Sequence, residues 1–190
     1  MKPQAKQRVS EAREVLKELD FPRAQSNERS ALVLLALLGL TPERPWAEAR
    51  NPMLGITEMM AFMRDHYEKD YAPNTRETVR RQPIHQFCDA GLATKNPDDP
   101  DRPTNSGQTV YQISHIAWSL MLRRGTTEWP GQLAAYLDRV GTLTERLERA
   151  RELRRIPVRL PSGTQISLSP EARIRSSGRS SKSSARDSFP

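Results

Sequence analysis

The sequence has almost none of the features that mark secreted or membrane proteins. It contains one cysteine in 190 residues, Cys88, which excludes an intrachain disulfide and favours a reducing compartment. The longest apolar run, residues 31–38, is far shorter than the roughly 18 residues that a membrane-spanning helix needs. The polar start MKPQAKQRVSEAR has no signal-peptide core. We therefore expect a soluble, cytoplasmic protein without a membrane segment.

Residues that would carry catalysis or bind a metal are also scarce. The only dense acidic group, Asp98, Asp99 and Asp101, lies between prolines in a polar loop, where a solvated turn is expected rather than a Mg²⁺ site. No glycine-rich phosphate loop occurs. The histidines are isolated and lack the spacing of metal ligands: His66, His85 and His115. We expect no catalytic residue, metal or cofactor in this chain, and no enzymatic activity of the chain alone.

Positive charge is what the chain has in surplus. The 30 Lys and Arg residues exceed the 23 Asp and Glu residues and give a formal net charge of +7. Such a surplus favours an anionic partner, nucleic acid first and a membrane surface second. Part of this surplus lies in residues 171–190, which contain five Lys or Arg residues and two acidic residues, Glu171 and Asp187. That segment is rich in serine and too poor in apolar residues to fold, so we expect it to be disordered.

The rest of the chain is typical of a mainly α-helical fold with small β-hairpins, because 36% hydrophobic and 28% charged residues suit helices with one buried face. Apolar residues recur at helical spacing in residues 9–19. The block ERSALVLLALLGL is apolar nearly all round and predicts the central buried helix, capped by Asn27. A further amphipathic helix is expected over residues 57–67.

A helix over residues 74–90 follows a tight break. Asn74 and Glu77 have the spacing of a capping box at its start. Pro83 lies inside this helix and predicts a kink or an irregular turn. The next segments, LA and TVYQI, predict a hairpin with a long polar tip at residues 95–108.

Helices are then expected over residues 115–123, 128–140 and 142–155, and a second hairpin in IPVRL-PSG-TQISL. The order of helix, break, capped basic helix and hairpin is that of a winged helix-turn-helix.

The polar side of residues 74–90 is the candidate for reading DNA. On a helical wheel Val79, Pro83, Ile84 and Phe87 share one side, with Cys88 at its edge. The opposite side carries donors and acceptors suited to base edges in the major groove: Thr75, Thr78, Arg81, Gln82 and His85. Residues better placed for phosphates are Arg76 and Arg80, and candidates at the tip of the wing are Lys95, Arg102, Asn105 and Gln108. The residues alone fit a solvated amphipathic helix equally well.

Four long stretches of the chain resemble a known family. NERSALVLLALLGL, NPMLGITEMMAFMRDHYEKDYAPNTRETVRRQPIHQF, GLATKNPDDPDRPTNSGQTVYQI and RELRRIPVRLPSGTQISLSP are similar to the N-terminal domain of the BsuBI/PstI restriction endonucleases, over roughly residues 25–170. The resemblance implies a winged helix-turn-helix domain that positions a type II endonuclease on a short palindromic DNA site. It also implies that Mg²⁺-dependent cleavage belongs to a separate C-terminal domain with no counterpart here.

The resemblance ends where the composition changes. Codons can be chosen for residues 171–185, EARIRSSGRSSKSSA, that read two bases along as GQNPLIRAIIEEFG, a string with the apolar spacing of a core helix. We hypothesise a frameshift near Pro170, which the coding DNA would test. The expected segments are an N-terminal helix or arm (1–24), the winged helix-turn-helix domain (25–155), a hairpin leading to the missing nuclease domain (156–170) and the tail (171–190).

The leading hypothesis is therefore a sequence-specific DNA-binding domain of a truncated type II restriction endonuclease, with double-stranded DNA as its partner. A stand-alone winged-helix transcriptional regulator is one alternative. A helical dimerisation protein is another, because an apolar stripe in residues 142–155 suits a homodimer seam as well as packing within the domain: Leu143, Leu147, Ala150 and Leu153.

Overall fold

The computed structural model describes residues 1–103, 106–153, 156–159 and 165–168, and from residue 142 onward the backbone alone. Its elements in chain order are α1 (Pro3–Glu18), α2 (Glu28–Leu37), the 3₁₀ turn η1 (Trp46–Glu48), α3 (Ile56–Tyr67), α4 (Thr75–Val79), the π-helical segment η2 (Arg80–Ile84), α5 (His85–Asp89), β1 (Ala93–Lys95), β2 (Tyr111–Ile113), α6 (His115–Met121), α7 (Trp129–Leu153), β3 (Ile156–Arg159) and β4 (Gln165–Leu168). No helix in these ranges is long and apolar enough to cross a bilayer.

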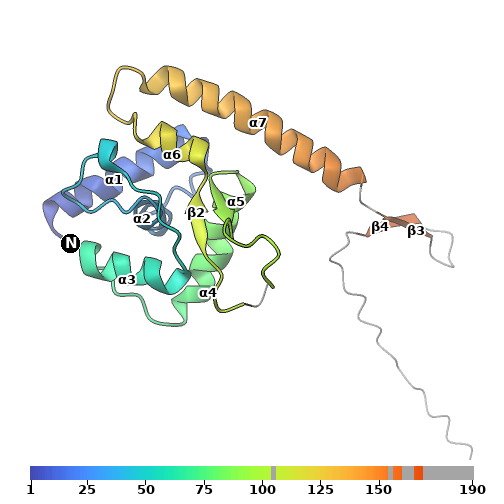
Figure 1. Ribbon diagram of the computed structural model, residues 1–190, viewed down its shortest axis with the longest axis horizontal. Helices are drawn as coiled ribbons and strands as arrows, with labels where there is room; N and C mark the ends of the chain where they lie inside the picture. Colours follow the sequence, from blue (N-terminus) through green and yellow to red (C-terminus); the bar gives the residue numbers. More distant parts are fainter. Residues whose placement is uncertain (104–105, 154–155, 160–164, 169–190) are drawn as a thin grey trace, which may run out of the picture. The chain divides into compact units, whose positions relative to one another are not determined.

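Helix α2 is the centre of the core. Figure 1 shows it nearly end-on, between α1 and α3. Every residue from 31 to 38 is fully buried, as the all-round apolar block predicts. The expected cap is confirmed, because Asn27 Oδ1 accepts a hydrogen bond from the backbone N–H of Ser30 at 3.0 Å.

A buried hydroxyl ties α3 to the end of α2. The Tyr67 hydroxyl donates to the carbonyl of Leu40 at 2.5 Å, and both residues are fully buried. Helix α3 begins one residue before the expected Thr57, where Glu58 Oε2 accepts from the Gly55 N–H at 2.6 Å. The orientation of α3 is therefore set at both of its ends.

The segment after α3 is one helix with a wide turn in its middle. Helix α4, η2 and α5 follow one another without a break, and Pro83 lies in η2. Proline lacks an N–H and its ring clashes with the carbonyl four residues earlier, so a wider turn accommodates it. The irregular turn predicted at Pro83 is confirmed.

The capping box predicted for this helix is wrong. Asn74 makes no capping hydrogen bond, because its backbone is already helical (φ −66°, ψ −16°), whereas a capping residue needs an extended backbone. The Glu77 carboxylate binds the side chains of Arg80 and Arg81 instead of the backbone at Asn74.

The predicted hairpin is confirmed, and a third segment extends it. Strands β1 and β2 pair antiparallel, with Ala93 opposite Ile113 and Lys95 opposite Tyr111. Leu54 pairs with Tyr111 from the other side of β2, through two backbone hydrogen bonds of 2.9 Å. The segment before α3 is thereby joined to the hairpin that follows α5. We call residues 93–113 the wing.

The two helices predicted over residues 128–140 and 142–155 are a single helix, α7. Gly141 does not interrupt it, because glycine inside a helix costs only about 1 kcal/mol relative to alanine. The start of α7 is held to α1, since Glu18 Oε2 accepts from Trp129 Nε1 at 2.6 Å and from Arg124 Nη1 at 2.5 Å.

Residues Leu147–Pro190 form a second unit. In it β3 and β4 pair antiparallel, with Ile156 opposite Leu168 and Arg159 opposite Gln165, which confirms the second hairpin. The predictions for its turn, for the apolar stripe of residues 142–155 and for the tail at 171–190 all fall outside the described backbone or side chains.

Candidate nucleic-acid interface

The helix formed by α4, η2 and α5 has one buried side and one open side. Val79, Pro83, Ile84 and Phe87 are buried, and the Phe87 ring meets the Phe21 ring edge-on at 5.5 Å between centroids. These are the residues that the wheel places on the apolar side, so that division is confirmed.

Cys88 is half-buried at the edge of this apolar side. Burial raises the pKa of its thiol to about 11, which keeps the thiol protonated at neutral pH. Its half-buried position agrees with its place at the edge of the apolar side of the wheel.

The open side carries the residues proposed to read bases. The side chains of Arg81 and His85 are 74% and 68% exposed, and Gln82 is exposed as well. Thr75 and Thr78 are half-buried. The structure thus brings these five candidates to one face, with the three longer side chains outermost. We call this set the reading face.

Glu77 is bonded to two arginines of the same helix. Its Oε2 accepts from Arg80 Nε at 2.9 Å, and its Oε1 accepts from Arg80 Nη2 at 2.7 Å. The same Oε1 also accepts from Arg81 Nε. Hydrogen bonds from Arg80 and then Arg81 lower the pKa of the Glu77 carboxyl to about 2, so it is ionised throughout the neutral range.

Gln82 has a partner from another helix. Arg29 Nη1, at the start of α2, donates to Gln82 Oε1 at 3.5 Å. The Arg29 guanidinium also lies 5.7 Å from the centroid of the Tyr71 ring. Because arginine has only donors, the oxygen of the Gln82 amide faces Arg29 and its NH₂ group is left for another partner.

Arg29 is not among the DNA-binding residues predicted from the sequence. Its position in the sequence was a weak signal. A cation in the first turn of a helix opposes the helix dipole, and this cost suggests that the side chain makes a compensating contact elsewhere. At the far end of the reading face, His85 Nδ1 lies 2.7 Å from Asp89 Oδ2.

Arg76, Arg80 and Lys95 line a cleft of about 580 Å³ beside the reading face. The first turn of α3 (residues 55–58) and the returning arm of the wing (residues 106–111) form its other walls. Arg76 and Lys95 are exposed and form no ion pair with any other described residue. The cleft therefore presents two unpaired cations and the shared charge of Arg80, against the one carboxylate of Glu58, which accepts from the Gly55 N–H.

Within the wing, Arg102 is committed to local contacts. Its side chain is 13% exposed, and it donates to Asp98 Oδ2 at 2.6 Å and to the carbonyl of Gln108 at 2.8 Å. Hydrogen bonding to Arg102 also lowers the pKa of the Asp98 carboxyl. Arg102 thus closes the wing and offsets part of its acidic charge.

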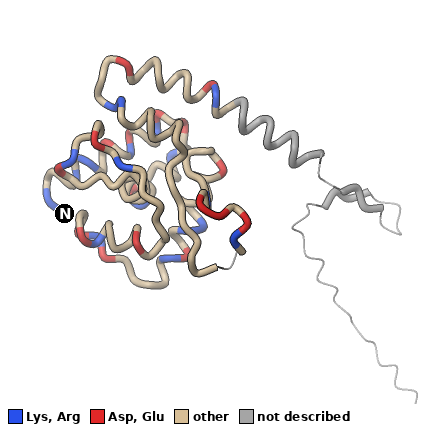
Figure 2. The backbone as a smooth tube through the Cα atoms, viewed as in Figure 1, with Lys and Arg blue, Asp and Glu red and all other residues tan. Residues whose placement is uncertain are grey.

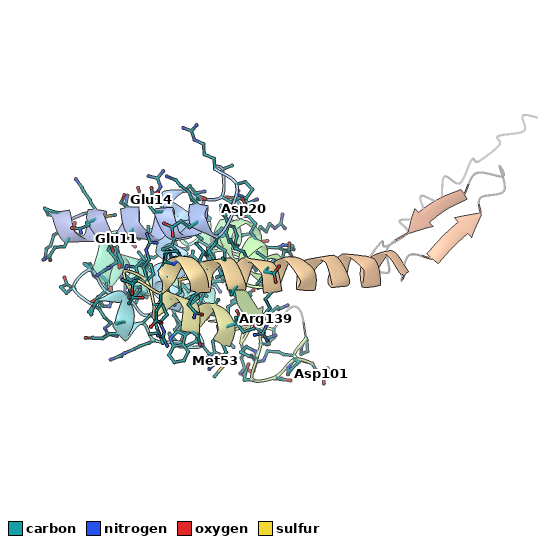
Figure 3. All side chains as sticks on the ribbon, turned by 90° about the horizontal axis from the view of Figure 1, so that it is seen from above. Glu11, Glu14, Asp20, Met53, Asp101 and Arg139 are labelled. Atoms are coloured by element: carbon teal, nitrogen blue, oxygen red, sulfur yellow. The ribbon has the colours of Figure 1, made fainter. Side chains whose placement is uncertain are left out.

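The remaining wing residues differ in position. The acidic stretch 98–101 is directly followed by Arg102 (Figure 2), and Asp101 lies at the outer end of the wing (Figure 3). Asn96 is buried, and its Oδ1 accepts from the Val110 N–H at 3.1 Å. Gln108 is exposed, and Asn105 lies outside the described residues.

The described part of the chain offers no set of residues that fits Mg²⁺. In it no three His, Cys, Asp or Glu side chains are grouped so that they could hold a metal ion. The carboxylates of Asp98 and Asp99 point to Arg102, at 2.6 and 3.6 Å, rather than toward a common point. No metal-dependent step is derived from these residues.

Comparison with known proteins gives a consistent set of matches. The family model described as "BsuBI/PstI restriction endonuclease HTH domain" matches residues 6–145. The type II restriction enzyme BsuBI of Bacillus subtilis is 49% identical over 162 residues, which are 85% of this chain and 51% of that protein. The type II restriction enzyme AplI of Arthrospira platensis is 35% identical over 168 residues, 88% of this chain and 52% of that protein.

A solved structure is similar as well. The structure of the SdaI restriction endonuclease matches with a TM-score of 0.67 and 33% sequence identity, over 86% of this chain and 51% of that one. The chain therefore spans about half the length of each of these relatives.

Proposed function

The chain belongs to the BsuBI/PstI restriction endonuclease family through its helix-turn-helix domain, and on that premise we propose that it is the sequence-specific DNA-binding part of a type II restriction endonuclease. Its partner is double-stranded DNA, and its recognition helix is the segment α4–η2–α5. Cleavage is not assigned to the described residues.

The order of elements supports this proposal. Helix α2, the paired segment at Leu54, α3, the recognition helix and the strands β1 and β2 follow one another as in a winged helix-turn-helix. In such domains the second helix of the motif enters the major groove and the wing lies beside it.

The observation that carries the proposal is the composition of the open side of this helix. Arg81 and Gln82 are exposed next to each other, and these are side chains that recognise guanine and adenine edges through paired hydrogen bonds. The same helix turns hydrophobic residues inward, so this face is free to enter a groove. His85, Thr75 and Thr78 complete it.

Phosphates are assigned to the cleft beside the reading face. Arg76, Arg80 and Lys95 come from the recognition helix and the wing, and phosphate contacts from two such elements fix the register of a protein on DNA. Gln108 on the returning arm of the wing lines the same cleft, and Arg102 would support the wing from within. Asn105 stays a candidate from the sequence alone.

The test is selection of duplexes from a pool with a randomised centre, using the full chain. The wild-type chain should enrich one sequence, and Arg81→Ala and Gln82→Ala should each relax selectivity at one position at a cost of about 1–3 kcal/mol per lost contact.

Lys17→Ala is a suitable control, because Lys17 is exposed on α1 and pairs with Glu14 there. Enrichment of no sequence by the wild-type chain would reject the proposal. Unchanged selectivity in both reading-face variants would reject this face as the reader.

A further inference from the structure

We propose that Glu77 is a positioning residue that sets the selectivity of DNA recognition by holding Arg81 ready on the reading face. This inference rests on the proposed function. Glu77 would not contact a base; it would act through the arginine that does.

The geometry shows how one carboxylate serves two arginines. Glu77 is followed on the helix by Arg80 and Arg81, three and four residues later, on the face where side chains meet. Both oxygens of the carboxylate bind Arg80 at 2.7 and 2.9 Å, and Oε1 is shared with Arg81. Arg80 lines the cleft, whereas Arg81 belongs to the reading face, so Glu77 lies at the boundary between the two.

The contact with Arg81 leaves its reading atoms open. Only Nε of Arg81 is bonded to Glu77, and the side chain as a whole is 74% exposed. Neither terminal Nη group of Arg81 is hydrogen-bonded to Glu77, so both remain available to donate to the O6 and N7 atoms of guanine. An arginine whose side chain is already oriented before binding loses less conformational entropy when it binds. This gain in affinity applies only to a base that fits that orientation.

Glu77 also limits attraction that carries no sequence information. Its negative charge offsets one of the three arginine charges on the recognition helix. A glutamate carboxyl is ionised at neutral pH, so that charge is in place there. Since unpaired cations bind any DNA backbone, releasing Arg80 and Arg81 would strengthen binding to all sequences alike.

Two substitutions distinguish the effect of the Glu77 charge from the effect of its side-chain length. Glu77→Gln removes the charge. Glu77→Asp keeps the charge but shortens the side chain by one methylene, so that it no longer spans both arginines. Glu14→Gln is the matched control, because Glu14 is an exposed glutamate on α1 with one ion-pair partner, Lys17. Figure 3 shows Glu14 well separated from the wing.

The experiment measures binding of each full-length chain to the duplex that the wild type enriches and to a scrambled duplex of the same composition. For Glu77→Gln we expect selectivity to fall by roughly five-fold or more. The slope of log K against log salt should become steeper by about 0.9. For Glu77→Asp selectivity should fall while the slope stays that of the wild type. Glu14→Gln should change neither.

The outcomes are distinct. If the wild-type chain enriches no duplex, the proposed function fails and the inference fails with it. If it enriches a duplex and both Glu77 variants keep the wild-type selectivity, the inference alone is overturned. Thermal melting establishes that each variant is folded, and if Glu77→Gln does not fold, the Glu77→Asp result decides.

Discussion

The cleft beside the recognition helix makes a quantitative prediction about salt. Arg76 and Lys95 have no ion-pair partner among the residues that the structure describes, whereas the charge of Arg80 is shared with Glu77. Each cation that neutralises a phosphate adds about 0.9 to the slope of log K against log salt. Arg76→Ala and Lys95→Ala should therefore each lower that slope by about 0.9, and the double variant by about 1.8. Between about 50 and 200 mM salt, one such contact changes affinity by about 3.5-fold.

Arg80→Ala should have a smaller effect on the slope than Arg76→Ala. Removing Arg80 also removes one partner of Glu77, whose carboxylate then remains on Arg81 alone. Arg76 and Arg80 both line the same cleft, so they differ chiefly in whether they pair with Glu77. The comparison isolates the contribution of the ion pair.

Fluorescence anisotropy titrations at several salt concentrations, on a selected and a scrambled duplex, would measure these slopes. Phosphate contacts should weaken binding to both duplexes by the same factor, because they carry no sequence information. Lys17→Ala on α1 serves as the control for a change of net charge. Slopes equal to that of the wild type in both Arg76→Ala and Lys95→Ala, or a larger effect of Arg80→Ala, would refute the assignment of the cleft to phosphates.

Three further predictions concern single side chains. Tyr67→Phe should lower the free energy of unfolding by about 1–3 kcal/mol, because the buried carbonyl of Leu40 loses its donor; denaturant titration measures this, and an unchanged midpoint would contradict it. Cys88 should react with iodoacetamide at neutral pH only after unfolding, since burial raises its thiol pKa to about 11; rapid labelling of the folded chain, seen by mass spectrometry, would count against this. Arg29→Ala should leave the fold intact but loosen the preference read by Gln82, and a selection that returns the wild-type consensus would argue against that contact.

The apolar pattern predicted most of the fold because burial follows local spacing. The block at residues 28–40 and the wheel of residues 74–90 gave the central helix and the buried side of the recognition helix. Pro83 signalled the irregular turn through the missing N–H of proline. The break predicted between residues 140 and 142 is absent, because one glycine marks the end of a helix only when the chain also turns there, and in α7 it does not.

The interpretation of Glu77 was wrong for a different physical reason. Its carboxylate can reach either the backbone N–H three residues earlier or the arginines three and four residues later, and the sequence contains both spacings. The backbone of Asn74 is helical and does not have the extended conformation of a capping residue, whereas Arg80 and Arg81 together donate three hydrogen bonds to the carboxylate. The pairing of Arg29 with Gln82 spans 53 residues, and no local pattern reports a contact at that separation.

The two sides of the recognition helix thus differ in how their charges are held, and this difference matters for recognition. On the cleft side Arg76 and Lys95 form no ion pair within the described part of the chain, which favours attraction to any phosphate backbone. On the reading face Arg81 and Gln82 each have a protein partner, Glu77 and Arg29, before DNA is present. A held side chain gains little from a sequence that does not match its orientation, whereas a free cation gains equally from all sequences. Affinity and selectivity would therefore be adjustable separately, through residues of the recognition helix and of the elements that contact it, β1 and α2.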